Sequence, residues 1–128
     1  MTNHWNQSRS NFRTGEPVDH LRAKDFIGTL LHQSGWDVQY EYPLVDSLVD
    51  KYHHNYDIVA IKKMVIVEID DPNLHSKPRK RANDLIASNH ALQKFPHAKF
   101  LRLDKYEVNA EPDIMTEYLN EYFWPFIK

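Results

Sequence analysis

The alternation of apolar and polar residues along the chain predicts a mixed order of helices and strands. Apolar residues recur at helical spacing after Pro17, and Gly35 provides a natural helix stop. Segments rich in aromatic and β-branched residues favour strands. The predicted elements are a helix over 18–31, strands over 36–42, 56–61 and 64–70, a helix over 79–94, a strand over 98–103 and a helix from Pro112.

This order, αβββαβα, predicts an α/β protein in which helices flank a central mixed sheet. The helix over 79–94 would return the chain to the sheet, so that the last strand lies parallel to an inner strand. Each of the two later helices carries one apolar stripe at helical spacing. The stripes are Ala82, Leu85, Ile86, Asn89 and Leu92 in the first, and Ile114, Met115, Tyr118, Leu119, Tyr122 and Phe123 in the second.

The second and third strands are apolar on both faces, which is typical of central strands, and only Lys62-Lys63 interrupts them. They predict a hairpin. Two lysines are not a favoured two-residue turn, so the loop has either two or four residues. Both symmetric loops give the same register, in which Asp57 lies opposite Glu68 and Asn55 lies opposite Asp70.

Opposed residues of an antiparallel pair share a face, with Cβ atoms ~5 Å apart. Asp57 and Glu68 would repel each other there unless one is protonated or a cation lies between them. Two carboxylates suit Mg²⁺ or Mn²⁺. Asp70 shares the face of Glu68 and is a third candidate ligand. The alternative is that Asp57 pairs with a lysine and that Asp70 only begins a polar loop.

Length and composition narrow the class of protein. The 128 residues fit a single domain over 16–128 that follows a polar N-terminal tail over 1–15. The absence of cysteine excludes a disulfide scaffold, a thiolate zinc site and a cysteine nucleophile. No apolar run reaches membrane-spanning length. We therefore expect an intracellular, cytoplasmic protein without a membrane partner.

Charge is distributed unevenly although the formal net charge is only -2. Residues 76–105 contain eight basic and two acidic side chains, whereas residues 106–128 contain five acidic side chains and one lysine. The basic segment offers a cationic face that suits phosphates. The alternative is that these are ordinary solvated helix surfaces.

The spacing of the acids resembles that of a known family. The strand residue Asp57, then Glu68-Ile69-Asp70, His75, and a helix with Arg81 and Asp84 are similar to the PD-(D/E)XK (restriction-endonuclease-like) nuclease superfamily. The likeness is nearest to the branch of the very short patch repair endonucleases and covers roughly residues 22–123. Tyr56 replaces the proline of the motif, and Asp70 replaces its lysine, which removes the usual water-orienting cation.

The resemblance implies a Mg²⁺-dependent endonuclease that hydrolyses phosphodiester bonds in DNA, with RNA not excluded. Metal would be held by Asp57, Glu68 and Asp70, and His75 would either act as general base or orient the attacking water. His75, Lys77 and Arg81 are the candidates for the role of the missing lysine. Helix residue Asp25 is a weaker candidate. The phosphate-binding candidates are Lys77, Arg79, Lys80 and Arg81.

Two alternative functions stay open at this point. The first is a nucleic-acid-binding or scaffold protein that keeps the nuclease fold, which the missing lysine favours. The second is a zinc hydrolase that uses His53, His54 and His75, although their spacing matches no common ligand pattern. Partners also stay open, because both a homodimer and recruitment to a larger complex suit so small a nuclease.

Overall fold

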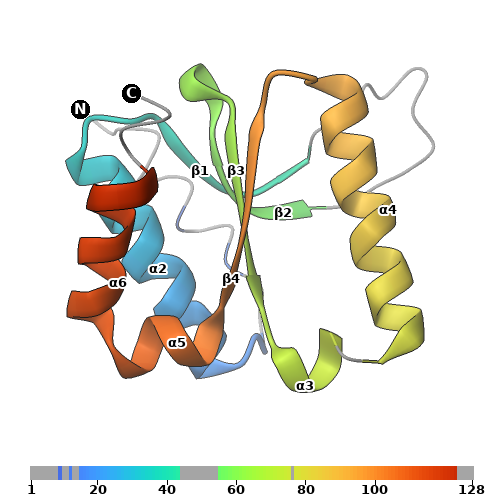
Figure 1. Cartoon of the computed structure of the whole chain (residues 1–128), viewed down its shortest axis with the longest axis horizontal. Coiled ribbons are helices and arrows are strands. Elements are labelled where there is room, and N and C mark those ends of the chain that lie inside the picture. Colours follow the sequence, from blue (N-terminus) through green and yellow to red (C-terminus); the bar gives the residue numbers. More distant parts are fainter. Residues whose placement is uncertain (1–8, 10–11, 13–14, 44–54, 76, 124–128) are drawn as a thin grey trace.

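The computed structural model describes the chain except residues 1–8, 10–11, 13–14, 44–54, 76 and 124–128. It is a mixed α/β fold in which helices flank a four-stranded mixed sheet (Figure 1). Its main elements are α2 (Val18–Gln33), β1 (Val38–Pro43), β2 (Asn55–Ala60), β3 (Val65–Asp70), α3 (Pro72–His75), α4 (Pro78–Lys94), β4 (Lys99–Asp104), α5 (Lys105–Ala110), α6 (Pro112–Tyr118) and a π-helical turn, η2 (Leu119–Phe123).

The sheet has the strand order β1-β2-β3-β4, in which β1, β2 and β3 are antiparallel neighbours and β4 runs parallel to β3. The predicted return of the chain to an inner strand is therefore confirmed. The predicted hairpin register is confirmed as well, because Ile58 pairs with Val67 and Ala60 with Val65. The connection is the four-residue alternative: a short 3₁₀ turn, η1 (Ile61–Lys63), followed by Met64 with φ of 50°.

Two hydrophobic clusters cover the two faces of the sheet. On one face, Ile27 and Leu31 of α2 pack with Val65 and Val67 of β3. On the other face, Ala87 and Ala91 of α4 pack with Ile66 and its neighbours. Figure 1 shows the same division, with α2, α5 and α6 on one side of the sheet and α4 on the other. The central strands β2 and β3 are consequently buried from both sides, as their apolar runs predict.

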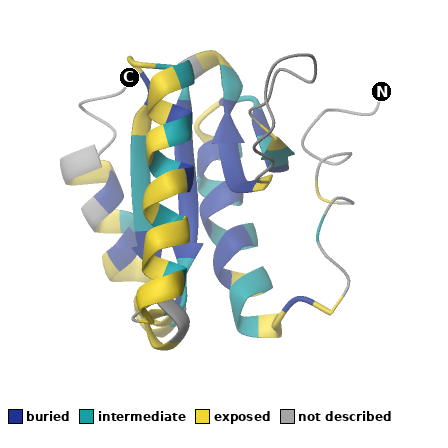
Figure 2. Cartoon of the chain, turned by 90° about the vertical axis from the view of Figure 1, so that its right-hand side faces the viewer, coloured by how far each residue is buried: buried dark blue, intermediate teal, exposed yellow. Residues whose placement is uncertain are grey.

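The sequence predicts the wrong face of α4 for packing against the sheet. Leu85 is 64% exposed and Ile86 is 50% exposed, whereas Ala87 and Ala91 are buried. Figure 2 looks onto the outer side of α4, where exposed residues follow one another along the helix. The small alanine side chains let the helix approach the sheet, where Tyr56 of β2 donates a hydrogen bond to the carbonyl of Ala87 (2.7 Å).

The C-terminal helical region begins earlier than the sequence predicts. Helix α5 starts directly after β4, because the Asp104 side chain caps it and accepts a hydrogen bond from the amide of Tyr106 (2.8 Å). In the stripe predicted for the last helix, Met115 and Leu119 are buried, but Ile114 is 58% exposed. The side chains of Tyr118, Tyr122 and Phe123 lie outside the described part of the structure.

Two of the described residues in the N-terminal segment contact the domain. The ring of Phe12 packs edge-on against that of Tyr40, with centroids 4.7 Å apart. Arg9 forms an ion pair with Asp25 of α2, with 3.1 Å between Nε and Oδ1. Within the described residues, no helix has both the length and the apolar character that a membrane crossing requires.

Helix α2 crosses the sheet closely at Gly28. A Cβ atom added there would lie 1.9 Å from the hydroxyl oxygen of Tyr40 and 2.4 Å from its ring carbon Cζ. Gly28→Ala is therefore expected to lower the free energy of unfolding by about 1–3 kcal/mol, because the core would be overpacked. In a Tyr40→Ala background the same change should stabilise the protein by up to about 1 kcal/mol through helix propensity. Urea denaturation of the four variants checks this, and equal effects in both backgrounds would contradict it.

Candidate functional site

Polar side chains converge where β2 begins and β3 ends. Strands β3 and β4 both run toward α3 and α5, and the N-terminal ends of α2 and α4 lie at the same end of the sheet (Figure 1). The acids Asp57 and Glu68 are at this end and are each only 7% exposed. The fold thus gathers strand ends and helix starts around two buried carboxylates.

Strands β1 and β2 both deviate from regular alternation at this end. Tyr56 and Ile58 are two residues apart but belong to the hydrophobic clusters on opposite faces of the sheet. In β1, Glu41 lies at the level of Asp57, between the pairs Tyr40–Ile58 and Tyr42–Tyr56. Its backbone is left-handed, with φ of 50°, which is strained for a residue other than glycine. The deviation turns the carboxylates of both Glu41 and Asp57 toward α2, where they meet Lys24 and His20.

The regular pairing predicted for Asp57 and Glu68 does not occur, because the last pair of the β2–β3 ladder is Ile58 with Val67. Instead, each carboxylate accepts a hydrogen bond from a backbone amide. The amide of Asp57 donates to Oε1 of Glu68 (2.7 Å), and the amide of Ile69 donates to Oδ2 of Asp57 (2.8 Å). By alternation Glu68 lies on the α4 face with Ile66, whereas Asp57 faces α2, so the two acids approach the splayed strand ends from different faces.

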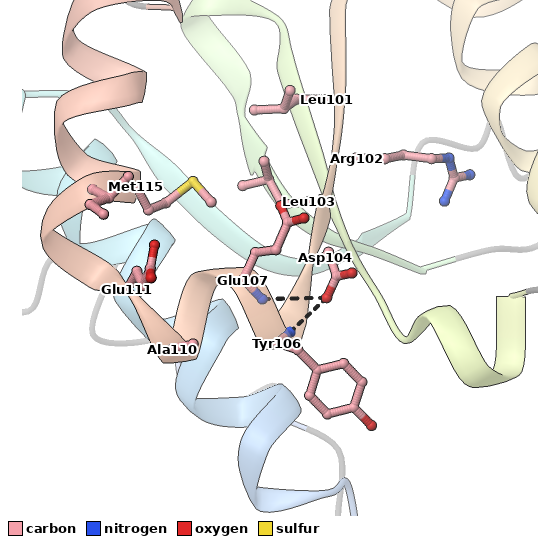
Figure 3. Close-up of a pocket in the computed structure, with 10 residues that line it drawn as sticks. Leu101, Arg102, Leu103, Asp104, Tyr106, Glu107, Ala110, Glu111 and Met115 are labelled. Atoms are coloured by element: carbon pink, nitrogen blue, oxygen red, sulfur yellow. Dashed lines mark hydrogen bonds between the residues drawn. The ribbon is translucent and has the colours of Figure 1, made fainter.

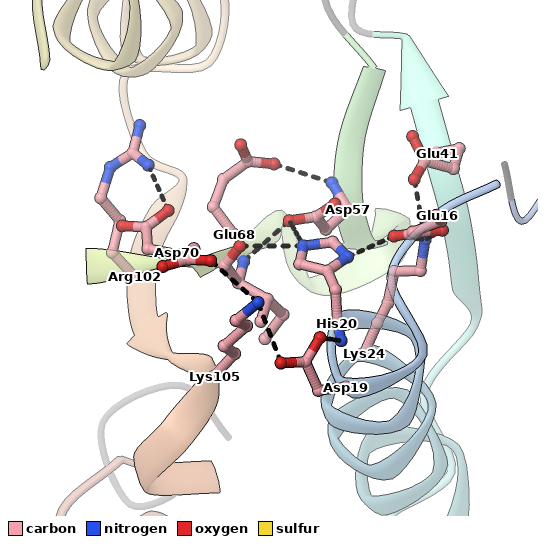
Figure 4. Close-up of polar contacts among 12 residues, drawn as sticks. Glu16, Asp19, His20, Lys24, Glu41, Asp57, Glu68, Asp70, Arg102 and Lys105 are labelled. Atoms are coloured by element: carbon pink, nitrogen blue, oxygen red, sulfur yellow. Dashed lines mark hydrogen bonds and ion pairs between the residues drawn. The ribbon is translucent and has the colours of Figure 1, made fainter. Parts of the chain in front are cut away.

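Helix α2 contributes a polar row that the sequence reading missed. Glu16 precedes α2, and His20 and Lys24 follow within the helix at steps of four residues, so the three side chains lie along one side of the helix start. His20 Nδ1 contacts Glu16, and His20 Nε2 lies 3.0 Å from the carbonyl oxygen of Ile69 and 3.6 Å from Oδ2 of Asp57 (Figure 4). The i, i+4 spacing of polar residues beside an apolar stripe is the sequence signal that would have identified them.

His20 is held as an imidazolium. A neutral imidazole has one donor and one acceptor nitrogen, but both ring nitrogens of His20 face acceptors only. Burial by itself would lower the pKa of His20, but the hydrogen bond and charge of Asp57, and then those of Glu16, raise it to about 9. The pKa of Asp57 is correspondingly lowered, because the nearby His20 outweighs the effect of burial.

Lys24 is fully buried, and its positive charge compensates the negative charges of two acids. Its Nζ donates to both oxygens of Glu16 (2.9 Å each) and to Oε1 of Glu41 (2.8 Å), which uses all three ammonium protons. Burial alone would raise the pKa of Glu16, but the hydrogen bond and charge of Lys24 lower it below 4.5. The site therefore rests on a buried charge network between α2 and the distorted part of β1.

The other predicted acid, Asp70, is engaged elsewhere. Its Oδ1 lies 2.9 Å from Nη1 of Arg102, and Arg102 also donates to Ser88 and to the carbonyl of Asp84 on α4 (2.8 Å each). Asp71 forms an ion pair with Lys105 (2.9 Å), which also binds Asp19 (3.0 Å). Burial would lower the pKa of Lys105, but Asp71 and Asp19 raise it to about 12.

The basic residues predicted to bind phosphates lie at the same end of the sheet. His75 ends the short helix α3, but its side chain lies outside the described part, as do His53 and His54. Lys77 immediately precedes α4, and the side chains of Arg79 and Arg81 in its first turns are exposed. Lys80 is half-exposed, with Nζ 3.7 Å from Oδ1 of Asp84. Asp25, paired with Arg9, is not among the contacts of Asp57 that the structure describes.

Among the described residues, one group of side chains could hold a metal ion. Glu16, His20 and Asp57 each offer a ligand atom, and these atoms lie within 4.8 Å of one another. Both ring nitrogens of His20 face acceptors and both oxygens of Glu16 bind Lys24, so Asp57 is the best ligand candidate of the three. Oδ1 of Asp57 makes no hydrogen bond within the described residues, and oxygen ligands suit Mg²⁺ or Mn²⁺.

The charge of His20 makes stability depend on pH. Its pKa rises from 6.5 to about 9 on folding, so its contribution is fully present below pH 6.5 and is lost as the pH rises through about 9. We expect a loss of about 2 kcal/mol over this interval after solvent screening is allowed for. In His20→Gln, this part of the slope should disappear when unfolding free energies at pH 6 and pH 9.5 are compared. An unchanged slope would show that folding does not raise the pKa of His20.

No protein-family model matches the chain, and neither the curated proteins nor the solved structures contain a significant match to it.

Proposed function

We propose that this chain is a divalent-metal-dependent endonuclease that hydrolyses phosphodiester bonds in DNA. The observation that carries the proposal is the presence of two buried carboxylates, Asp57 and Glu68, at the diverging ends of the central strands, where each accepts a hydrogen bond from a backbone amide. Carboxylates inside apolar strands are costly unless they have a partner or a ligand. Here β2 leaves its regular geometry at Asp57, which is typical of functional positions rather than of a simple core.

Asp57 and Glu68 are the residues that would hold Mg²⁺ or Mn²⁺. Such an ion, when bound, lowers the pKa of a coordinated water and neutralises charge that develops on the phosphate. His20 acts as a positioning residue, because its contact with Asp57 fixes where the carboxylate points. Asp70 is a weaker ligand candidate than the sequence suggested, because a metal would have to compete with Arg102 for it.

The basic residues at the start of α4 support a polyanionic substrate. Lys77, Arg79 and Arg81 are exposed at the end of the sheet that carries the acids. Their contacts with phosphates would be independent of sequence and sensitive to salt. His75, two residues before Lys77, remains the candidate for general base.

A second function is favoured by a separate observation. Asp57, Glu68 and Asp70 all have protein partners already: two backbone amides and one arginine. For acids with such partners, a purely structural role is sufficient: they accept hydrogen bonds from backbone amides and from an arginine where the strands diverge. The second candidate is therefore a nucleic-acid-binding or scaffold protein that uses the basic end of α4 without cutting.

One experiment separates the two functions. The purified chain is incubated with supercoiled plasmid and either Mg²⁺, Mn²⁺ or a chelator, and DNA binding is measured in parallel by mobility shift. The nuclease proposal expects metal-dependent nicking that Glu68→Gln abolishes while binding persists. Salt-sensitive binding with no nicking in either metal would reject it in favour of the scaffold function.

A further inference from the structure

A groove lies between the edge strand β4 and the helices α5 and α6. It has a volume of about 680 Å³. Its apolar lining includes Leu101 and Leu103 of β4, Met115 of α6 and the exposed side chain of Ile114 (Figure 3 labels the first three). A hollow of this size is in the range of ~300–1,000 Å³ that is usual for binding sites.

The groove adjoins a strand that has a neighbour on one side only. Within the described sheet, β4 pairs with β3 and no strand pairs with its other edge. Figure 1 looks onto this edge, and β4 lies in front of the other strands. Alternate residues of such a strand direct their N–H and C=O groups away from the sheet, where they can bind another extended chain.

The rim of the groove is acidic. Asp104, Glu107 and Glu111 line it, and Glu107 and Glu111 are exposed. The one basic residue of the lining, Arg102, forms an ion pair with Asp70. Neither of these two glutamates forms an ion pair with a described residue, and residues 106–128 as a whole contain five acids and one lysine. Positive charge on a bound segment would be complementary to this rim.

We infer that this groove binds an extended segment of a partner protein in which apolar and basic residues alternate. The segment would add as a strand to the free edge of β4, and its apolar side chains, two residues apart, would lie over Leu101 and Leu103. Its lysines or arginines would face Glu107 and Glu111. The inference does not depend on the proposed nuclease activity, because it uses a different face and different residues.

The test uses a fluorescein-labelled heptapeptide, Lys-Ile-Lys-Ile-Lys-Ile-Lys, and measures its affinity for the full chain by fluorescence anisotropy. The Glu107→Gln/Glu111→Gln double variant should bind about tenfold more weakly, which corresponds to about 1.4 kcal/mol. The matched control, Glu117→Gln/Glu121→Gln, removes two exposed charges from the same C-terminal region but outside the groove lining, and it should bind as the unmodified chain does. Equal losses in both double variants would mean that the peptide senses only overall charge, and would overturn the inference.

Two further measurements test the mode of binding. A heptapeptide with N-methyl groups on alternate residues keeps the side chains but cannot donate to β4, so it should bind at least about tenfold more weakly. Hydrogen exchange of the amides in β4 should slow when the unmethylated peptide is bound. Ile114→Gln, at a 58% exposed position that should tolerate the change, should also weaken binding. Undiminished binding of the methylated peptide, or a dimer of the chain that excludes the peptide, would reject this partner for the groove.

Discussion

Asp57→Asn is expected to lower metal-dependent nicking of plasmid by about a thousandfold or more. A metal held by carboxylates supplies several kcal/mol of charge stabilisation in the transition state, and each 1.36 kcal/mol corresponds to a tenfold change in rate. Asparagine is similar in size and its carbonyl oxygen can still accept the hydrogen bond from the amide of Ile69. The fold should therefore persist while the ligand charge is lost, and initial nicking rates at saturating Mn²⁺ measure the difference.

The matched control for this variant is Asp25→Asn. Asp25 lies on α2, and its ion pair is with Arg9, at a more exposed position than Asp57. It should retain nicking within a factor of about two, because exposed ion pairs contribute little. If Asp57→Asn nicks DNA as fast as the control, Asp57 holds no metal and its role is confined to the strand ends.

Lys24→Met is expected to lower the free energy of unfolding at pH 7 by about 3–5 kcal/mol, because it leaves Glu16 and Glu41 buried without their cation. Methionine keeps much of the side-chain length, so the loss comes mainly from charge. Urea denaturation followed by circular dichroism measures it. A loss below about 1 kcal/mol would mean that the acids find other partners or protonate at little cost.

The pH dependence of this variant provides an internal check. In the unmodified chain, burial tends to raise the pKa of Glu16, and the hydrogen bond and charge of Lys24 counteract this and lower the pKa. Without Lys24 that pKa should rise, so protonation of Glu16 would relieve part of the cost as the pH falls toward 5. The triple variant Lys24→Met/Glu16→Gln/Glu41→Gln should recover much of the stability at pH 7, because no buried charge remains unpaired.

The local pattern was a reliable guide to strands and register. The two apolar runs around Lys62-Lys63 have the length and the two-sided apolar character of central strands joined as a hairpin. The symmetric two-residue and four-residue loops both give the same pairing, and this register is the one observed. The four-residue alternative for the loop is the observed one, because Met64 adopts the left-handed conformation that closes it. Such features depend on neighbouring residues and therefore can be read from the sequence.

The packing of α4 shows where local reasoning fails. Leu85 and Ile86 make the more apolar face, but Ala87 and Ala91 make the face that fits. A close helix–sheet contact requires small side chains, and hydrogen bonds from Tyr56 and Arg102 fix the helix rotation. Neither condition is visible in the periodicity of α4 alone.

The sequence by itself determined the order of helices and strands along the chain, the hairpin register and the presence of Asp57 and Glu68 at the ends of central strands. Only the tertiary structure decided which way those acids point and that Arg102 engages Asp70. It also decided that Glu16, just before α2, and His20 and Lys24 of α2 lie against Asp57 and Glu41. The reason is physical: alternation and loop symmetry are set by residues close in the chain. The direction of a buried carboxylate is set instead by the charges and amides that distant segments bring to it.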